Sequence, residues 1–181
     1  MFRFSPAPGV EVRQFEPHEA EAVFASVERN RAYLREWLPW VDPTQSAQVV
    51  REFIHRSRVQ YDNHQGPSCG IWMDGESIGS IGCHPIDWAN RQAAIGYWID
   101  PRHSGKGLVT QCCILLIDYL FDLGIHRVVI QCGTRNTKSC AIPRRLGFVR
   151  EGVMREGQWV NDRWVDLEVW SMLEDEWRKR G

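Results

Sequence analysis

The chain has 181 residues, of which 43% are hydrophobic, and its 22 basic and 23 acidic side chains leave a net charge of -1. This length suits one domain, residues 1–181, and the balanced charge argues against binding to DNA or to an anionic membrane. The sequence has no apolar run near the ~20 residues of a membrane span and no signal-peptide pattern at its start, so we expect a cytoplasmic protein.

The first half of the chain predicts helices followed by an antiparallel sheet. A first strand is expected over residues 10–15, and a helix from Pro17 to about Asn30. Residues 33–40 form a short helix or turn, and a third helix follows a cap at Thr44 or Ser46. Strands over residues 68–73 and 77–84 flank the turn Asp74-Gly75, and a third strand returns over residues 92–99.

The second half predicts a βαβ unit and a hairpin. A helix from Leu108 to Leu123 leads to a strand over residues 127–132, which should run parallel to strand 92–99. After a short helix beginning at Asn136, residues 159–164 turn through Asn161-Asp162 into a strand ending at Met172, and a helical tail closes the chain. The predicted fold class is therefore α+β, a mixed sheet with helices on both faces.

The segment from Tyr97 to Thr110 carries the strongest local signal. A strand passes through Asp100-Pro101 and a loop containing Gly105 and Gly107 into a long helix. The free N–H groups at such a helix start, together with the helix dipole, suit a phosphate or pyrophosphate. A Walker A loop needs Ser or Thr where Gly107 stands, and a dinucleotide fingerprint needs Gly or Ala where Thr110 stands. A plain strand-to-helix turn stays open at this point.

A second segment, residues 136–148, contains Asn136-x-x-Ser139 and ends in Leu146-Gly147-Phe148. Together with the run Arg102-His103-Ser104-Gly105-Lys106-Gly107, it resembles the acyl-CoA N-acyltransferase (GNAT) superfamily. Three features resemble the RimJ/RimL branch, which acetylates protein N-terminal amines: the run Gly96-Tyr97-Trp98, the Ala-Ile-Pro-x-Arg-Leu-Gly-Phe ending of the second segment, and the Glu-Gly tail. The resemblance runs from about Leu38 to the C-terminus.

This resemblance implies a mostly antiparallel, twisted sheet with one splayed parallel strand pair, and acetyl-CoA as the co-substrate. Unpaired amides of the splayed strand cost ~1–3 kcal/mol each, and the pantetheine arm would pair with them. No metal is implied, and the six cysteines show no Cys-x-x-Cys spacing. The implied cofactor-binding residues are Trp98, Ile99, Arg102, His103, Ser104, Gly105, Lys106, Gly107, Leu108, Val109, Thr110, Asn136, Lys138 and Ser139.

Ser139 is the candidate general acid, because a hydroxyl near the sulfur can protonate the departing thiolate. A backbone N–H near Ile99 would stabilise the oxyanion. The alternative for Ser139 is a role in capping the helix that starts at Asn136. Pro143 provides no N–H for the Ser139 carbonyl and loosens that helix.

The general base is not identified by the resemblance. The glutamate of the RimL-like tail aligns with Gln158, and Ala94 stands where that branch often has an acidic residue. The substitutes are His84, Glu156, Asp166 and Glu168, acting through water.

The acceptor is expected to be a primary amine, and the expected substrate-binding residues are Trp37, Trp40 and Tyr97. At pH 7 a protein α-amine is neutral in roughly a tenth of molecules and lysine in roughly one of a few thousand, which favours an N-terminal or small-molecule amine. The alternatives are a small-molecule amine acceptor, another donor such as succinyl-CoA, an acyl-CoA sensor without catalysis and a nucleotide-binding domain. The Trp-rich tail hairpin suggests a homodimer.

Overall fold

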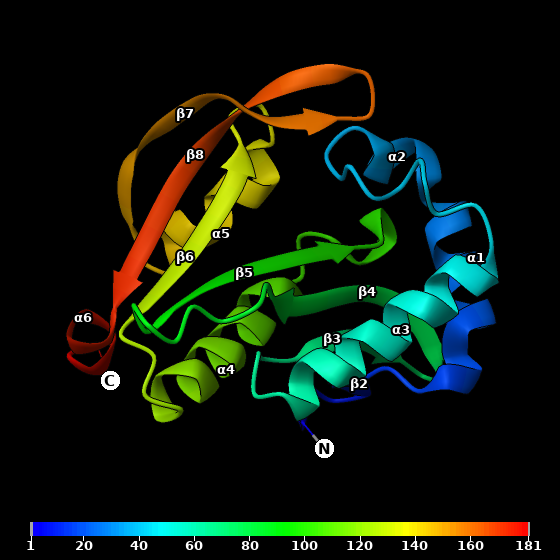
Figure 1. Cartoon of the computed structure of the whole chain (residues 1–181), viewed down its shortest axis with the longest axis horizontal. Coiled ribbons are helices and arrows are strands. Elements are labelled where there is room, and N and C mark those ends of the chain that lie inside the picture. The colour runs from blue at the N-terminus through cyan, green and yellow to red at the C-terminus, as the bar shows by residue number, and fades with distance from the viewer. Residues whose placement is uncertain (1, 181) are drawn as a thin grey trace.

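The computed structural model describes residues 2–180, and one eight-stranded sheet organises them (Figure 1). The strand order is β1-β2-β3-β4-β5-β6-β8-β7, with β5–β6 as the parallel pair and antiparallel pairing elsewhere. The strands are β1 (Arg3–Ala7), β2 (Val10–Gln14), β3 (Ser68–Met73), β4 (Glu76–Cys83), β5 (Gln92–Ile99), β6 (Arg127–Gly133), β7 (Val149–Val160) and β8 (Arg163–Leu173).

Helices cover both faces of the sheet, as predicted. On one face, Trp72 of β3 packs in a core with residues of α1 and α3, including Val23 and Ile54. On the other, the adjacent Ile71 belongs to a larger core with Leu116 of α4 and Cys140 of α5. The helices are η1 (Pro17–Glu19), α1 (Ala20–Arg29), α2 (Arg31–Arg35), α3 (Ala47–Asp62), η2 (Pro101–His103), α4 (Leu108–Asp122), α5 (Thr137–Arg145) and α6 (Glu174–Arg178). None of these helices is long and apolar enough to cross a membrane.

Two strands lie outside the sequence prediction. The strand starting at Val10 is the second strand, because β1 precedes it and pairs with it across a turn at Gly9. Strand β7 begins at Val149, ten residues before the predicted hairpin. Both are edge strands: no residue of β1 is buried, and most side chains of β7 are exposed. Neither strand therefore shows the apolar alternation by which a half-buried strand is found.

The predicted turns form with the expected backbone. Asp74 and Gly75 both take positive φ, 49° and 83°, between β3 and β4. Asn161 takes φ 55° between β7 and β8. Ser46, rather than Thr44, caps α3 by accepting a hydrogen bond from the Val49 N–H, since the Thr44 hydroxyl donates to the Trp40 carbonyl.

The parallel strands β5 and β6 separate halfway along their length. Their pairing begins at Gln92 with Arg127 and ends at Ile95 with Ile130. Beyond this point β5 continues beside β4 and β6 beside β8, so the two strands diverge (Figure 1). A bulge at Ile78, where β4 pairs with β3, lies beside the free half of β5.

Candidate active site

The divergence leaves backbone groups of β5 without a strand partner. The Ala94 carbonyl accepts from the His84 N–H, and the Asp100 N–H donates to the Ile78 carbonyl, so even-numbered residues direct their backbone groups towards β4. Because this direction alternates along a strand, the N–H and C=O of Tyr97 and Ile99 face the side that β6 has left. An extended ligand carrying amides can pair there.

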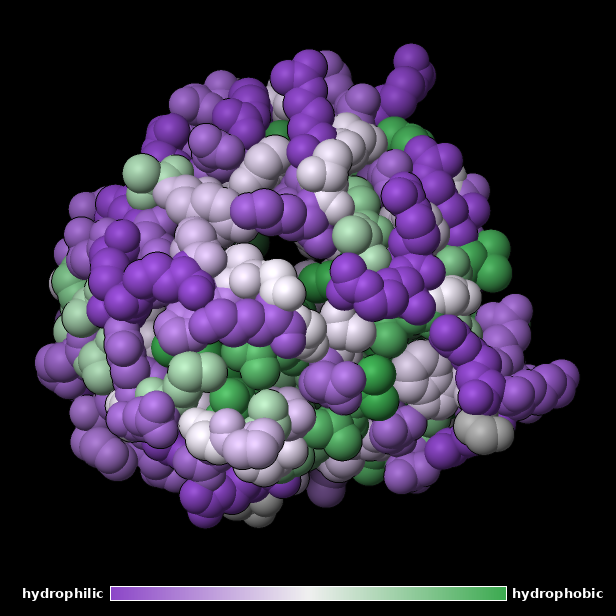
Figure 2. Space-filling model, turned by 180° about the vertical axis from the view of Figure 1, so that it is seen from behind, coloured by the Kyte–Doolittle hydropathy of each residue, from purple (hydrophilic) through white to green (hydrophobic). Residues whose placement is uncertain are grey.

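Two cavities, of about 780 and 410 Å³, meet at this opening. Figure 2 shows the surface hollowed near its centre on the side opposite to that of Figure 1. The larger cavity extends towards the glycine loop and α4, and the smaller one lies over β4, β5 and the end of β6. The residues that line both are Trp37, Leu38, Tyr97, Trp98, Asn136 and Ser139.

The glycine loop ends in an open helix start. Gly107 is the N-cap of α4 and takes φ 75°, and Gly105 takes φ 77°. A Cβ built on either glycine would meet no atom within 4 Å apart from its chain neighbours, so the loop is open where it enters α4. In the same loop, the Nδ1 atom of His103 is buried without a hydrogen-bond partner in the described chain. The N–H groups at the start of α4 and this opening fit a phosphate group.

The larger cavity is lined by basic and not by acidic side chains. His103, Lys138 and Arg145 line it, and no Asp or Glu among residues 2–180 does so. Arg145 is a site residue that sequence reasoning missed. Its guanidinium donates to the Thr110 hydroxyl over 2.8 Å, so the last turn of α5 reaches the first turn of α4.

Arg102 and Lys106 do not line either cavity. The Arg102 guanidinium donates to the carboxylates of Asp100 and Glu76. Asp100 is fully buried and also accepts from the Arg102 backbone N–H and from Asn30. Burial favours a raised pKa for Asp100, but the hydrogen bonds from Arg102 outweigh it and hold the pKa well below its ordinary value. Arg102 therefore anchors the glycine loop to the end of β5.

The structure separates the parts played by Asn136 and Ser139. The Asn136 side chain caps α5 by accepting from the Ser139 backbone N–H over 3.2 Å. The cap therefore uses the Ser139 backbone, and the hydroxyl is left out of it. The Ser139 carbonyl, which Pro143 cannot satisfy, accepts a hydrogen bond from the Tyr97 hydroxyl over 3.2 Å. Tyr97 thus ties the free half of β5 to the start of α5.

Three further groups gather on this side of the sheet. The thiols of Cys132 and Cys140 and a carboxylate oxygen of Glu168 lie within 4.8 Å of one another. Burial raises the pKa of both thiols, and the charge of Glu168 raises them further, so both stay neutral. Glu168 is held by Arg150 at 3.2 Å and by the Trp170 indole at 3.0 Å.

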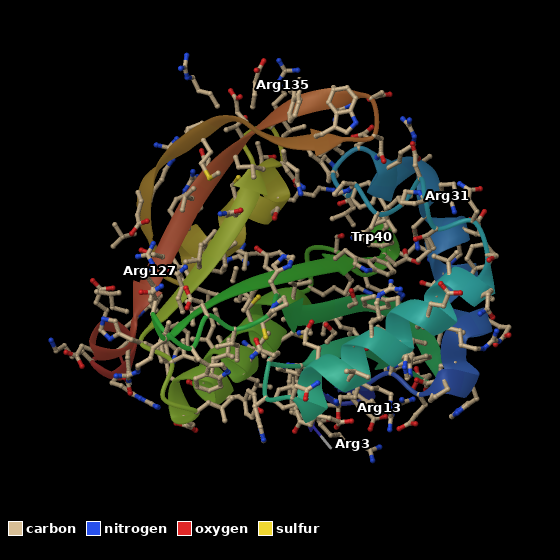
Figure 3. The ribbon with its side chains drawn as sticks, in the orientation of Figure 1. Arg3, Arg13, Arg31, Trp40, Arg127 and Arg135 are labelled. Carbon is tan, nitrogen blue, oxygen red and sulfur yellow. The ribbon has the colours of Figure 1, made fainter. Side chains whose placement is uncertain are left out.

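The tip of the β7–β8 hairpin contacts the segment that follows α1. Asn161 donates to the carbonyls of Arg35 and Leu38, Arg163 donates to the Glu36 carbonyl, and Asp162 pairs with Arg35 at 3.1 Å. This contact joins β8, on one side of the separated strands, to α2, on the other, and so closes the opening from above. Trp40 lies beneath it, with its ring centroid 6.3 Å from that of Trp98 (Figure 3).

The family model for the acetyltransferase (GNAT) domain matches residues 10–149. The chain belongs to the GNAT acetyltransferase family. YdaF of Bacillus subtilis, provisionally named a ribosomal N-acetyltransferase, is 38% identical over 179 residues, which cover 98% of each chain.

Solved GNAT acetyltransferases share the whole fold. A complex of RimL, a ribosomal α-N-protein acetyltransferase, with coenzyme A has a TM-score of 0.91 and 25% identity, covering 97% of this chain and 99% of that one. The microcin C7 self-immunity acetyltransferase MccE with acetyl-CoA and AMP has a TM-score of 0.87 and 27% identity, with coverage of 93% and 94%. Acetyl-CoA is the co-substrate of this acetyltransferase, and its polyanionic end fits the basic lining and open helix start of the larger cavity.

Proposed function

We propose that this GNAT acetyltransferase transfers the acetyl group of acetyl-CoA directly to the α-amine of a protein or peptide N-terminus. The observation that carries the proposal is the smaller cavity. It opens on the same backbone as the larger one and is closed from above by the contact of the hairpin with residues 35–38. An acceptor therefore enters it end-on, which suits a chain terminus.

The lining of the smaller cavity argues against a polyamine. Among residues 2–180 no Asp or Glu lines it, so a ligand with several ammonium groups would be left with unpaired buried charges. Ser80, Ala94 and Gly96 are among its lining residues, and their small side chains leave room for the first side chain of a peptide. The name of the relative YdaF points to ribosomal proteins as the class of acceptor to test first.

In the proposed reaction, acetyl-CoA supplies the thioester and the amine nitrogen attacks its carbonyl carbon. The free N–H groups of Tyr97 and Ile99 would donate to the oxygen that becomes negative. As the C–S bond breaks, the Ser139 hydroxyl would protonate the sulfur, because it lies at the junction of both cavities.

The test is an acetylation assay with matched peptides, read as free thiol released above the hydrolysis rate. One peptide carries a free N-terminus and no lysine, a second is N-terminally blocked with one internal lysine, and spermidine is the third acceptor. We expect kcat/KM to be at least ~10-fold higher for the first peptide, because its amine is neutral more often at pH 7. A preference for spermidine or for the lysine would contradict the proposal.

We also propose a homodimer formed through the β7–β8 hairpin. Strand β7 is an edge of the sheet. Strands β7 and β8 together carry five exposed apolar side chains: Val149, Val153, Met154, Trp159 and Trp164. Such a patch on an edge strand is typical of a protein interface. Light scattering at micromolar concentration should give twice the 21.0 kDa chain mass, and a monomeric mass would end this proposal.

A further inference from the structure

The resemblance to the RimJ/RimL branch implies acidic residues at positions 158 and 94, but the smaller cavity, where the acceptor is proposed to bind, has no ionisable side chain at either position. Gln158 and Ala94 both line it, and neither side chain can take a proton. An ammonium group that enters the cavity must lose a proton before its nitrogen can attack. The group that receives this proton has to be found elsewhere in the lining.

The acidic residues suggested by the sequence lie outside the cavity. Glu168 is paired with Arg150 and faces Cys132 and Cys140. The Asp166 carboxylate accepts from the backbone N–H of Glu156, and Glu156 is exposed in an irregular part of β7. None of the three lines the smaller cavity.

His84 is the remaining candidate, and its position is suitable. His84 follows β4, and its backbone N–H donates to the Ala94 carbonyl over 2.8 Å. Neighbours across an antiparallel pair place their side chains on one face, so the imidazole shares the face of Ala94 and Gly96. A Cβ built on Gly96 would lie 4.0 Å from the His84 Nε2 atom.

Gly96 is also the residue at which the free part of β5 begins. The pairing with β6 ends one residue earlier, at Ile95, and Tyr97 is the first residue with unpaired groups on that side. The His84 imidazole therefore stands beside the place where an amine would meet the thioester carbon. The absence of a side chain at Gly96 keeps the space between them open.

We propose that His84 is the general base for the acceptor amine, an inference that rests on the proposed transfer to a peptide terminus. The Nε2 atom takes one proton from the ammonium group and later releases it to solvent. The amine nitrogen then forms the C–N bond as the C–S bond breaks, and its second proton goes to the sulfur by way of the Ser139 hydroxyl. The products are the amide, the free thiol and one proton.

No charged side chain of the described residues lines the smaller cavity beside His84. Among its lining residues are Ala94 and Gly96 from β5, Gln60 from α3, and Ser68, Cys69 and Cys83 from β3 and β4. Burial raises the pKa of both thiols, to about 12 for Cys83, so they stay neutral in any assay near pH 7. Among residues 2–180 no Asp, Glu, Lys or Arg lines the cavity.

The experiment compares His84→Gln and His84→Ala with His55→Gln, a control on the exposed side of α3. The acceptor is the amine that wild type uses fastest, assayed at pH 7 and pH 9.5. At pH 7 we expect kcat/KM to fall about 10-fold in both His84 variants, because only about a tenth of the α-amine is neutral without a base, and to be unchanged in the control. At pH 9.5 an α-amine is already neutral, so the deficit should shrink to below about 2-fold.

Added imidazole should restore part of the pH 7 rate of His84→Ala, and acetyl-CoA affinity should stay unchanged because His84 lies outside the larger cavity. A rate within 3-fold of wild type at pH 7, or an equal loss at both pH values, would overturn the role of His84 while leaving the transfer reaction in place. No turnover by wild type with any amine would overturn both proposals.

Discussion

The Tyr97 hydroxyl donates to the Ser139 carbonyl oxygen over 3.2 Å, and so joins β5 to α5 across the opening where the substrates meet. Proline at position 143 removes the N–H that would satisfy this carbonyl within the helix. Burial raises the pKa of Tyr97 well above its ordinary value, so the phenol stays protonated and remains a donor. The irregular helix and the buried tyrosine therefore complement each other.

Tyr97→Phe should lower both stability and turnover. The Ser139 carbonyl would lose its donor, at a cost of ~1–3 kcal/mol in the free energy of unfolding, and the Ser139 hydroxyl would be less well positioned. Urea denaturation and kcat measure the two effects. Tyr33→Phe is the control for stability alone, because Tyr33 lines the larger cavity and its hydroxyl has no hydrogen-bond partner among residues 2–180. A similar loss of stability in that variant would contradict the interpretation.

Ser139→Ala should reduce kcat about 100-fold with acetyl-CoA affinity within about 2-fold of wild type. The cap of α5 uses the Ser139 N–H, which alanine keeps, so the helix should remain stable. Asn136→Ala, which removes the cap acceptor, should instead cost ~1 kcal/mol of stability. A protein that only binds acyl-CoA would have no rate to lose in Ser139→Ala.

Gly107→Val should abolish measurable acetyl-CoA binding in isothermal titration. The side chain would occupy the open space where the loop enters α4, and the left-handed φ of 75° adds ~1–2 kcal/mol of strain. Gly75→Val is the matched control, because Gly75 has φ 83° and equally open space in a hairpin remote from both cavities. It should lose similar stability and keep its affinity, and equal affinity losses in the two variants would point to unfolding.

Arg145→Ala should mainly weaken acetyl-CoA binding, whereas Arg102→Ala should mainly reduce stability. Arg145 lines the larger cavity, so its loss should weaken acetyl-CoA binding about 10-fold with little change in stability. Arg102 holds the buried Asp100, so its loss should lower the free energy of unfolding. Titration and urea denaturation of both variants decide this. Weaker binding by Arg102→Ala at unchanged stability would mean that Arg102 contacts the cofactor.

The Arg127–Glu151 pair should make stability fall at acidic pH. Arg127, labelled in Figure 3, donates two hydrogen bonds to Glu151, of 2.7 and 2.6 Å. Together with one from Ser171 they lower the pKa of Glu151 to about 2. Because the folded-state pKa lies below the ordinary value of 4.5, the stabilisation is present above pH 4.5 and is lost as the pH falls towards 2. Glu151 is partly exposed, so the effect should stay below about 1 kcal/mol.

Glu151→Gln tests this by urea denaturation at pH 6 and pH 2.5. The variant should be less stable than wild type at pH 6, and the difference should largely disappear at pH 2.5, where wild-type Glu151 is itself mostly protonated in the unfolded state and partly so in the folded one. A difference that is the same at both pH values would show that the pair does not titrate as the structure indicates.

The sequence by itself determined the backbone of the site. The Asp100-Pro101 break, the glycines at 105 and 107 and the cap at Asn136 act over a few residues, so their pattern predicts the loop and both helix starts. The order of strand, helix and strand likewise fixed the parallel pair β5–β6.

Only the tertiary structure decided which side chains face the cavities. The guanidinium of Arg102 donates to Asp100. Arg145 contacts Thr110, 35 residues earlier in the sequence, and Tyr97 contacts Ser139, 42 residues later. Such partners depend on where β5 and β6 separate and on how α5 packs beside α4, and no local pattern encodes these distances. Edge strands β1 and β7 escaped prediction for a related reason, because their stability comes from the neighbouring strand and not from an apolar face of their own.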